Sequence, residues 1–113
     1  MHELGLISAV VKTVEKIMAE EELTSVEEIV LQVGELSGVI PRYVEECYPA
    51  AVYKTSLEKT KLIMEVVPGI VRCKICGEEF SGYLHDLKCP KCGSEELDAL
   101  SGREFVIKEI HAC

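Results

Sequence analysis

Two segments, Cys73–Gly77 (Cys-Lys-Ile-Cys-Gly) and Cys89–Gly93 (Cys-Pro-Lys-Cys-Gly), decide how this chain is organised. Each Cys-x-x-Cys pair forms a tight turn that can point two thiolates at one ion, and the glycine after it can take the positive φ that such a turn needs. Two pairs complete a tetrahedron with no open position for water or substrate. The spacing therefore predicts a structural zinc site. Its ligands are Cys73, Cys76, Cys89 and Cys92.

Around these pairs, residues 70–100 contain few periodic hydrophobic residues. A segment of about thirty residues has too little core to fold alone, and a bound metal supplies on the order of 10 kcal/mol of folding free energy. We therefore expect a zinc-binding domain at 70–100, inserted into a second domain made of 1–69 and 101–113. The Pro68-Gly69 and Gly102 connections are short and could act as a hinge.

Iron is an alternative metal, because Cys-Pro-Lys-Cys-Gly resembles the iron-binding turns of rubredoxins, which carry electrons. Rubredoxin pairs lie further apart and are surrounded by aromatic residues, whereas this insert has only Phe80 and Tyr83. Free reduced thiols or a redox dithiol are further alternatives, but a redox role needs one pair at the start of a helix. Zinc is favoured.

Outside the insert, the hydrophobic pattern alternates between helical and strand periods. Pro49 should kink or interrupt the second helix. The order predicts an α+β fold in which two helices cover one face of a three-stranded mixed sheet, and the insert, a four-cysteine zinc-ribbon-like module, protrudes between the last two strands. We expect helices from Met1 to about Glu22 and from Pro41 to about Ser56, and strands at Val26–Leu36, Thr60–Val67 and Arg103–His111.

Charge and composition limit the functional classes. The formal net charge of −8 repels nucleic-acid phosphates, so nucleic-acid binding is disfavoured. No apolar run approaches the roughly 20 residues of a membrane span, and no basic segment precedes an apolar core near Met1, so we expect a cytoplasmic protein with no membrane contact. Cytosolic thiols stay reduced, and the six cysteines therefore favour metal binding over disulfides.

The first three residues, Met1-His2-Glu3, form a second candidate metal site. The α-amine, the His2 amide and imidazole and the next amide can place four nitrogens in a plane, which selects Ni(II) or Cu(II) over zinc. The Glu3 carboxylate could ligate or orient such an ion. The alternative is a solvated His2, with Glu3 as an ordinary first-turn acid favoured by the helix dipole.

Three motifs together resemble the HypA/HybF family of hydrogenase maturation nickel chaperones. They are Met1–Leu4, the segment Val33–Gly38 (Val-Gly-Glu-Leu-Ser-Gly), and the paired cysteines with Cys89–Ser94. The resemblance covers essentially the whole chain and departs from many members at Gly5, where they carry serine. It implies a nickel chaperone and not an enzyme.

By that resemblance, residues 1–69 and 101–113 form a nickel-binding domain in which His2 is the nickel ligand, with Met1 and Glu3 alongside. The nickel would be transferable and the zinc structural. The implied partners are a HypB-type GTPase and the large subunit of [NiFe] hydrogenase, with urease as another recipient. A monomer and a homodimer are both compatible with the sequence. A zinc-ribbon interaction module and a rubredoxin-like electron carrier are the alternative functions.

The other candidate ligands have simpler explanations. Cys47 lies on the apolar stripe of the second helix and is expected in the core. His85 is expected in an exposed loop, and His111 and Cys113 in a disordered tail. The acidic run 20–22 is expected to be a solvated surface.

Overall fold

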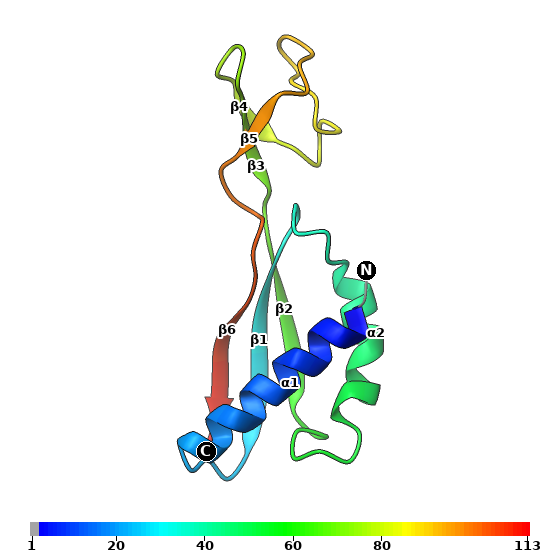
Figure 1. Cartoon of the computed structure of the whole chain (residues 1–113), viewed down its shortest axis with the longest axis vertical. Coiled ribbons are helices and arrows are strands. Elements are labelled where there is room, and N and C mark those ends of the chain that lie inside the picture. Colours follow the sequence, from blue (N-terminus) through cyan, green and yellow to red (C-terminus); the bar gives the residue numbers. More distant parts are fainter. Residues whose placement is uncertain (1–2) are drawn as a thin grey trace.

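A computed structural model describes residues 3–113 as an elongated molecule of 54 × 24 × 16 Å. Two helices and three long strands form its lower part in Figure 1, and three short strands and several loops form its upper part. We call residues 70–100 the cysteine lobe, and residues 3–69 with 101–113 the helical lobe. The elements are α1 (Glu3–Glu20), β1 (Val26–Gly34), α2 (Pro41–Val52), β2 (Lys61–Val67), β3 (Ile70–Cys73), β4 (Glu79–Ser81), β5 (Leu97–Ala99) and β6 (Phe105–Ala112).

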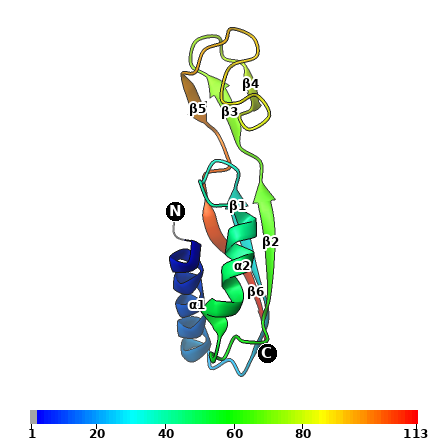
Figure 2. The same cartoon turned by 90° about the vertical axis from the view of Figure 1, so that its right-hand side faces the viewer.

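The helical lobe contains the predicted mixed sheet, with strand order β2-β1-β6. β1 pairs with β2 in parallel and with β6 in antiparallel fashion. Both helices lie on the same side of this sheet, as Figure 2 shows. Successive side chains of a strand point to opposite faces, so Ile29, Leu31 and Val33 of β1 all face the helices and are fully buried. The predicted α+β architecture, with the insert between the last two strands, is confirmed.

Helix α1 buries a stripe that includes Ile7, Val11 and Val14. Leu4, three residues before Ile7, is 48% exposed. Residues at intervals of four share a face of a helix, and Glu3 is the residue four before Ile7. The buried position in the first turn therefore belongs to Glu3 and not to Leu4.

Helix α2 begins at Pro41, where a proline costs little because its missing N–H has no helical acceptor. Val44, Tyr48 and Val52 are its buried face. The prediction that Pro49 interrupts the helix is wrong, since the helix continues to Val52. Pro49 lies in the last turn, where it removes a single backbone hydrogen bond on the exposed side. The helix nevertheless ends four residues before the predicted Ser56.

The end of the chain corrects another prediction. His111 and Cys113 do not form a disordered tail, because β6 continues to Ala112, which pairs with Val26 of β1. The Cys113 N–H donates to the Ser25 carbonyl, and the Thr24 N–H donates to the Cys113 carbonyl, each over 3.0 Å. Residues 20–22 are exposed, as predicted.

The cysteine lobe has its own three-stranded antiparallel sheet, of order β4-β3-β5, which the sequence pattern did not reveal. Its core is small and is completed by partly buried Leu97 and by Leu36 from the helical lobe. The buried members of this core are Val71, Cys73, Phe80 and Cys89. Two of them are predicted metal ligands, so the ion site is part of the core of this lobe.

Candidate metal centre

The two Cys-x-x-Cys turns have the same backbone construction. In the first, the Gly77 N–H donates to the Cys73 carbonyl over 2.9 Å; in the second, the Gly93 N–H donates to the Cys89 carbonyl over 2.8 Å. Both glycines have positive φ, 80° and 76°, as the sequence predicts. The Cys76 nitrogen lies 3.5 Å from the Cys73 sulfur, and the Cys92 nitrogen lies 3.5 Å from the Cys89 sulfur. Each turn therefore holds its first sulfur with backbone N–H groups.

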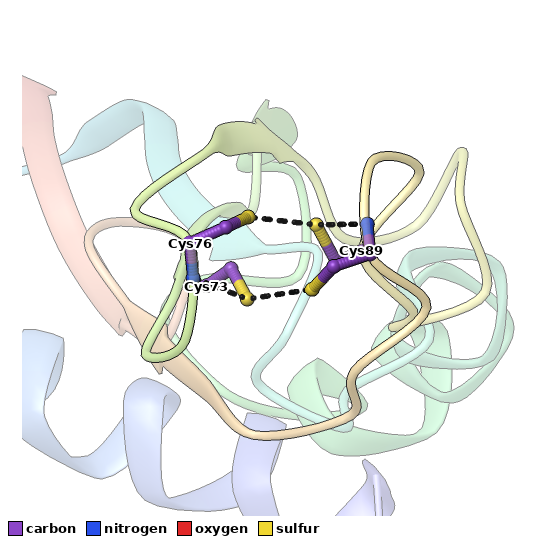
Figure 3. Close-up of side chains that lie close together, drawn as sticks. Cys73, Cys76 and Cys89 are labelled. Carbon is purple, nitrogen blue, oxygen red and sulfur yellow. Dashed lines mark hydrogen bonds between the residues drawn. The ribbon is translucent and has the colours of Figure 1, made fainter.

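The two turns face each other and bring their four sulfurs together. The Sγ atoms of Cys73 and Cys92 are 3.5 Å apart, as are those of Cys76 and Cys89, and all four lie within 4.8 Å of one another. Figure 3 shows the side chains of the two turns pointing toward one another. A tetrahedral ion about 2.3 Å from each sulfur needs neighbouring sulfurs about 3.8 Å apart. The sulfur positions therefore fit one tetrahedral metal ion.

Burial differs between the two cysteines of each turn. Cys73 and Cys89 are 2% and 3% exposed, whereas Cys76 and Cys92 are exposed to solvent. The inner sulfurs are thus anchored in the small core, and the outer sulfurs close the site from the solvent side. Within residues 3–113, no other group of three or more His, Cys, Asp or Glu ligand atoms is this closely spaced.

Electrostatics in the cluster also indicate a cation. The backbone N–H of Cys76, helped by that of Ile75 and by neighbouring thiols, lowers the pKa of Cys73 to about 6 despite burial. At Cys92 the Ser94 N–H lowers the pKa, but the nearby Cys73 sulfur, partial desolvation of the thiol and the other sulfurs outweigh it and raise the pKa to about 12. Four thiols this close cannot all ionise alone, and a divalent cation removes that repulsion.

The remaining candidate residues lie away from these sulfurs or have structural roles. His85 is exposed, as predicted, and packs edge-to-face on Phe80 with ring centroids 5.6 Å apart. Cys47 is partly buried against the helical core. His111 contacts the Glu109 carboxylate at 3.3 Å on the exposed end of β6.

The predicted nickel ligands are only partly described. Met1 and His2 lie outside the described residues, and Glu3 begins α1. Glu3 is 8% exposed, and the only other polar residue buried in the described part of the chain is Thr60. The Thr60 hydroxyl donates to the Val26 carbonyl over 2.7 Å. The burial of Glu3 is the feature that a simple helix-dipole interpretation does not predict.

Fold and site together define a small α+β protein that carries a closed four-cysteine metal site on an inserted lobe. A family model described as "Hydrogenase/urease nickel incorporation, metallochaperone, hypA" matches residues 1–112. The chain therefore belongs to the HypA family of nickel metallochaperones. The family is one of metallochaperones and not of enzymes, as the resemblance implies.

Individual relatives agree with this assignment. The hydrogenase maturation factor HypA of Streptomyces avermitilis is 42% identical over 98% of this chain and 86% of that protein. The Geobacter metallireducens factor is 38% identical over 97% of both. The solution structure of the nickel metallochaperone HypA from Helicobacter pylori covers 99% of this chain and 97% of that one, with a TM-score of 0.67 at 20% identity. Within residues 3–113, no helix has the length and apolar character needed to cross a membrane.

Proposed function

We propose that this chain binds Ni(II) at its first three residues and delivers it during the maturation of a nickel enzyme, [NiFe] hydrogenase or urease. The proposed nickel ligands are His2, the Met1 α-amine with adjoining backbone amides, and Glu3. Membership of a nickel-incorporation family supports the cargo, and the match of the family model from residue 1 supports this end of the chain.

The observation that carries the ligand assignment is the burial of Glu3. Burying a carboxylate costs free energy unless it is paired or coordinates a cation. Glu3 as a whole residue is 8% exposed and directly follows His2, so its carboxylate is placed to balance a divalent ion held by nitrogen donors. An amine–amide–imidazole set releases protons on binding, so its affinity falls with acidity, which suits loading and release.

The four-cysteine site has a different proposed role. Cys73, Cys76, Cys89 and Cys92 would hold a resident Zn(II) that stabilises the cysteine lobe. Four thiolates leave no open position, so this ion would not be the one that is passed on. The proposed partners are a HypB-type GTPase and the large subunit of [NiFe] hydrogenase, and we place this work in the cytoplasm.

Equilibrium nickel binding tests the N-terminal assignment. Protein whose chain starts at Met1 should bind one Ni(II) more than His2→Ala and more than a version extended by several residues before Met1. Zinc content should stay at one per chain in all three, because the cysteine lobe is not altered. Glu3→Gln should weaken nickel binding less than His2→Ala does.

The other two histidines supply matched controls. His85→Ala and His111→Ala also remove one imidazole each, and they should bind nickel as the parent protein does. Unchanged nickel affinity in His2→Ala, or a loss in His111→Ala equal to that in His2→Ala, would exclude the proposed ligand set.

A further inference from the structure

Three chain segments meet between the two lobes: 34–36 at the end of β1, 68–69 between β2 and β3, and 101–104 between β5 and β6. Backbone hydrogen bonds join them closely. The Gly34 N–H donates to the Glu104 carbonyl and the Leu36 N–H to the Gly102 carbonyl, each over 2.7 Å, and the Glu35 N–H donates to the Val67 carbonyl over 3.0 Å. The segment 34–36 therefore pairs with the end of β2 and with the 101–104 connection at once.

Three glycines allow these backbone segments to approach one another closely. Gly34, Gly69 and Gly102 are all buried at this junction. A Cβ on Gly102 would lie 2.5 Å from the Gly69 Cα, and a Cβ on Gly34 would overlap the Gly102 carbonyl. Only residues without a side chain fit at these two positions, so the crossing is packed backbone against backbone and has no room for sliding.

Two side chains of segment 34–36 contact the 68–69 connection, and one of them also reaches the cysteine lobe. The Glu35 carboxylate accepts a hydrogen bond from the Gly69 N–H over 2.8 Å. The Leu36 side chain covers the same glycine, where a Cβ would come within 2.5 Å of the Leu36 Cγ, and it packs against the core of the cysteine lobe. A side chain from the helical lobe is thus part of the hydrophobic packing around the metal site.

We propose that Gly34-Glu35-Leu36 is an interlobe clasp that fixes the orientation of the cysteine lobe relative to the helical lobe. Glu35 is a positioning residue, since it acts through the Gly69 backbone. The Pro68-Gly69 and Gly102 connections are then parts of a rigid junction and not the hinge that their composition suggested. This inference does not depend on which metal either site binds.

A rigid junction also keeps the shape of the hollow beside it constant. This apolar hollow of about 540 Å³ is lined by Tyr83 from the cysteine lobe and by Ile40 and Val66 from the helical lobe. All three of these side chains remain largely exposed to solvent. Because the clasp holds the two lobes in one orientation, the two walls of the hollow stay at a constant distance from each other.

Residual dipolar couplings of backbone N–H groups test the clasp in the metal-loaded full chain. In the parent protein, couplings from both lobes should fit one alignment tensor. In Glu35→Ala, couplings of the cysteine lobe should shrink, and the Gly69 N–H should exchange with solvent roughly tenfold faster. Two different tensors in the parent protein would overturn the proposal.

Two further variants separate the specific contact from general damage. Glu35→Gln keeps a side-chain oxygen that can accept the Gly69 N–H, so it should restore the single tensor and slow exchange. Glu45→Ala removes an exposed carboxylate from α2 and should behave as the parent protein. Because Glu35 is itself exposed, the alanine variant should still fold. If Glu35→Ala and Glu45→Ala give the same couplings and the same exchange, the proposed role of Glu35 is wrong.

Discussion

Tyr48 is the residue that ties α2 to the start of β2. Its hydroxyl donates to the Thr60 carbonyl over 2.9 Å, and its ring is in the helical core. Burial raises the pKa of Tyr48 above its usual value near 10. The folded state therefore favours the neutral phenol, whose stabilising contribution is complete below pH 10 and is lost as the pH rises through the folded pKa.

Replacing Tyr48 by phenylalanine should lower the free energy of unfolding at pH 7 by about 1 to 2 kcal/mol, because the Thr60 carbonyl loses its buried donor. The variant should also lose stability less steeply than the parent protein above pH 10. Urea unfolding at pH 7 and at several pH values from 9 to 11 measures both effects.

Tyr53→Phe is the matched control, since Tyr53 is 65% exposed and should change stability little. Parallel pH curves for Tyr48→Phe and the parent protein would contradict the role assigned to the buried phenol.

Single residues show which features of the sites a sequence can reveal. The four cysteines were predictable because two local turns and their spacing determine the ligand set. The burial of Glu3 was not, because an acidic residue at a helix start has an ordinary explanation, and its burial depends on how α1 packs. The role of Glu35 was equally hidden, since its partner Gly69 lies 34 residues away.

At the scale of elements, the Cys-x-x-Cys turn that begins with Cys73 follows directly from β3. Cys73 is the last residue of that strand and also a member of the small core. Strand, core and metal site thus share one side chain, so loss of its thiolate should disturb all three.

Cys73→Ser should therefore reduce the resident metal from one ion per chain toward zero, whereas Cys47→Ser, which alters a partly buried thiol on α2, should retain it. Elemental analysis of purified protein gives the metal content, and cobalt substitution gives the sulfur-to-metal absorption bands. A full complement of tightly held metal in Cys73→Ser would show that the four sulfurs are not the ligands.

Elements were predictable wherever the hydrophobic period was long. α1, β1, β2 and β6 were expected from their patterns, with ends that differ by one or two residues. The three short strands of the cysteine lobe were missed because each has only three or four residues, too few to show a repeating apolar pattern. The ordered end of β6 was missed because its pairing partner, Val26, lies far away in the sequence.

At the scale of the whole molecule, two sheets with separate hydrophobic cores are joined through one junction. The core of the helical lobe has fourteen buried residues, whereas that of the cysteine lobe has four, two of them the cysteines Cys73 and Cys89. We therefore expect the folding of the smaller lobe to depend on a bound metal far more than that of the larger lobe does.

Removing the metal with a chelator should abolish amide-exchange protection in residues 70–100 and leave it largely intact in β1, β2 and β6. Mass-spectrometric hydrogen exchange on the full chain, before and after chelation, measures this difference. Restoring zinc should restore protection in the cysteine lobe. Equal loss in both lobes would show that residues 70–100 are not a separate metal-dependent domain.

The unequal exposure of the four cysteines would set the route by which an ion bound between them enters or leaves. Cys76 and Cys92 lie on the outside, whereas Cys73 and Cys89 are fixed in the core. A competing thiol or an oxidant in the solvent would reach Cys76 and Cys92 first, while Cys73 and Cys89 still hold the ion. Metal exchange at this site would therefore pass through an intermediate in which two cysteines have released the ion and two still bind it.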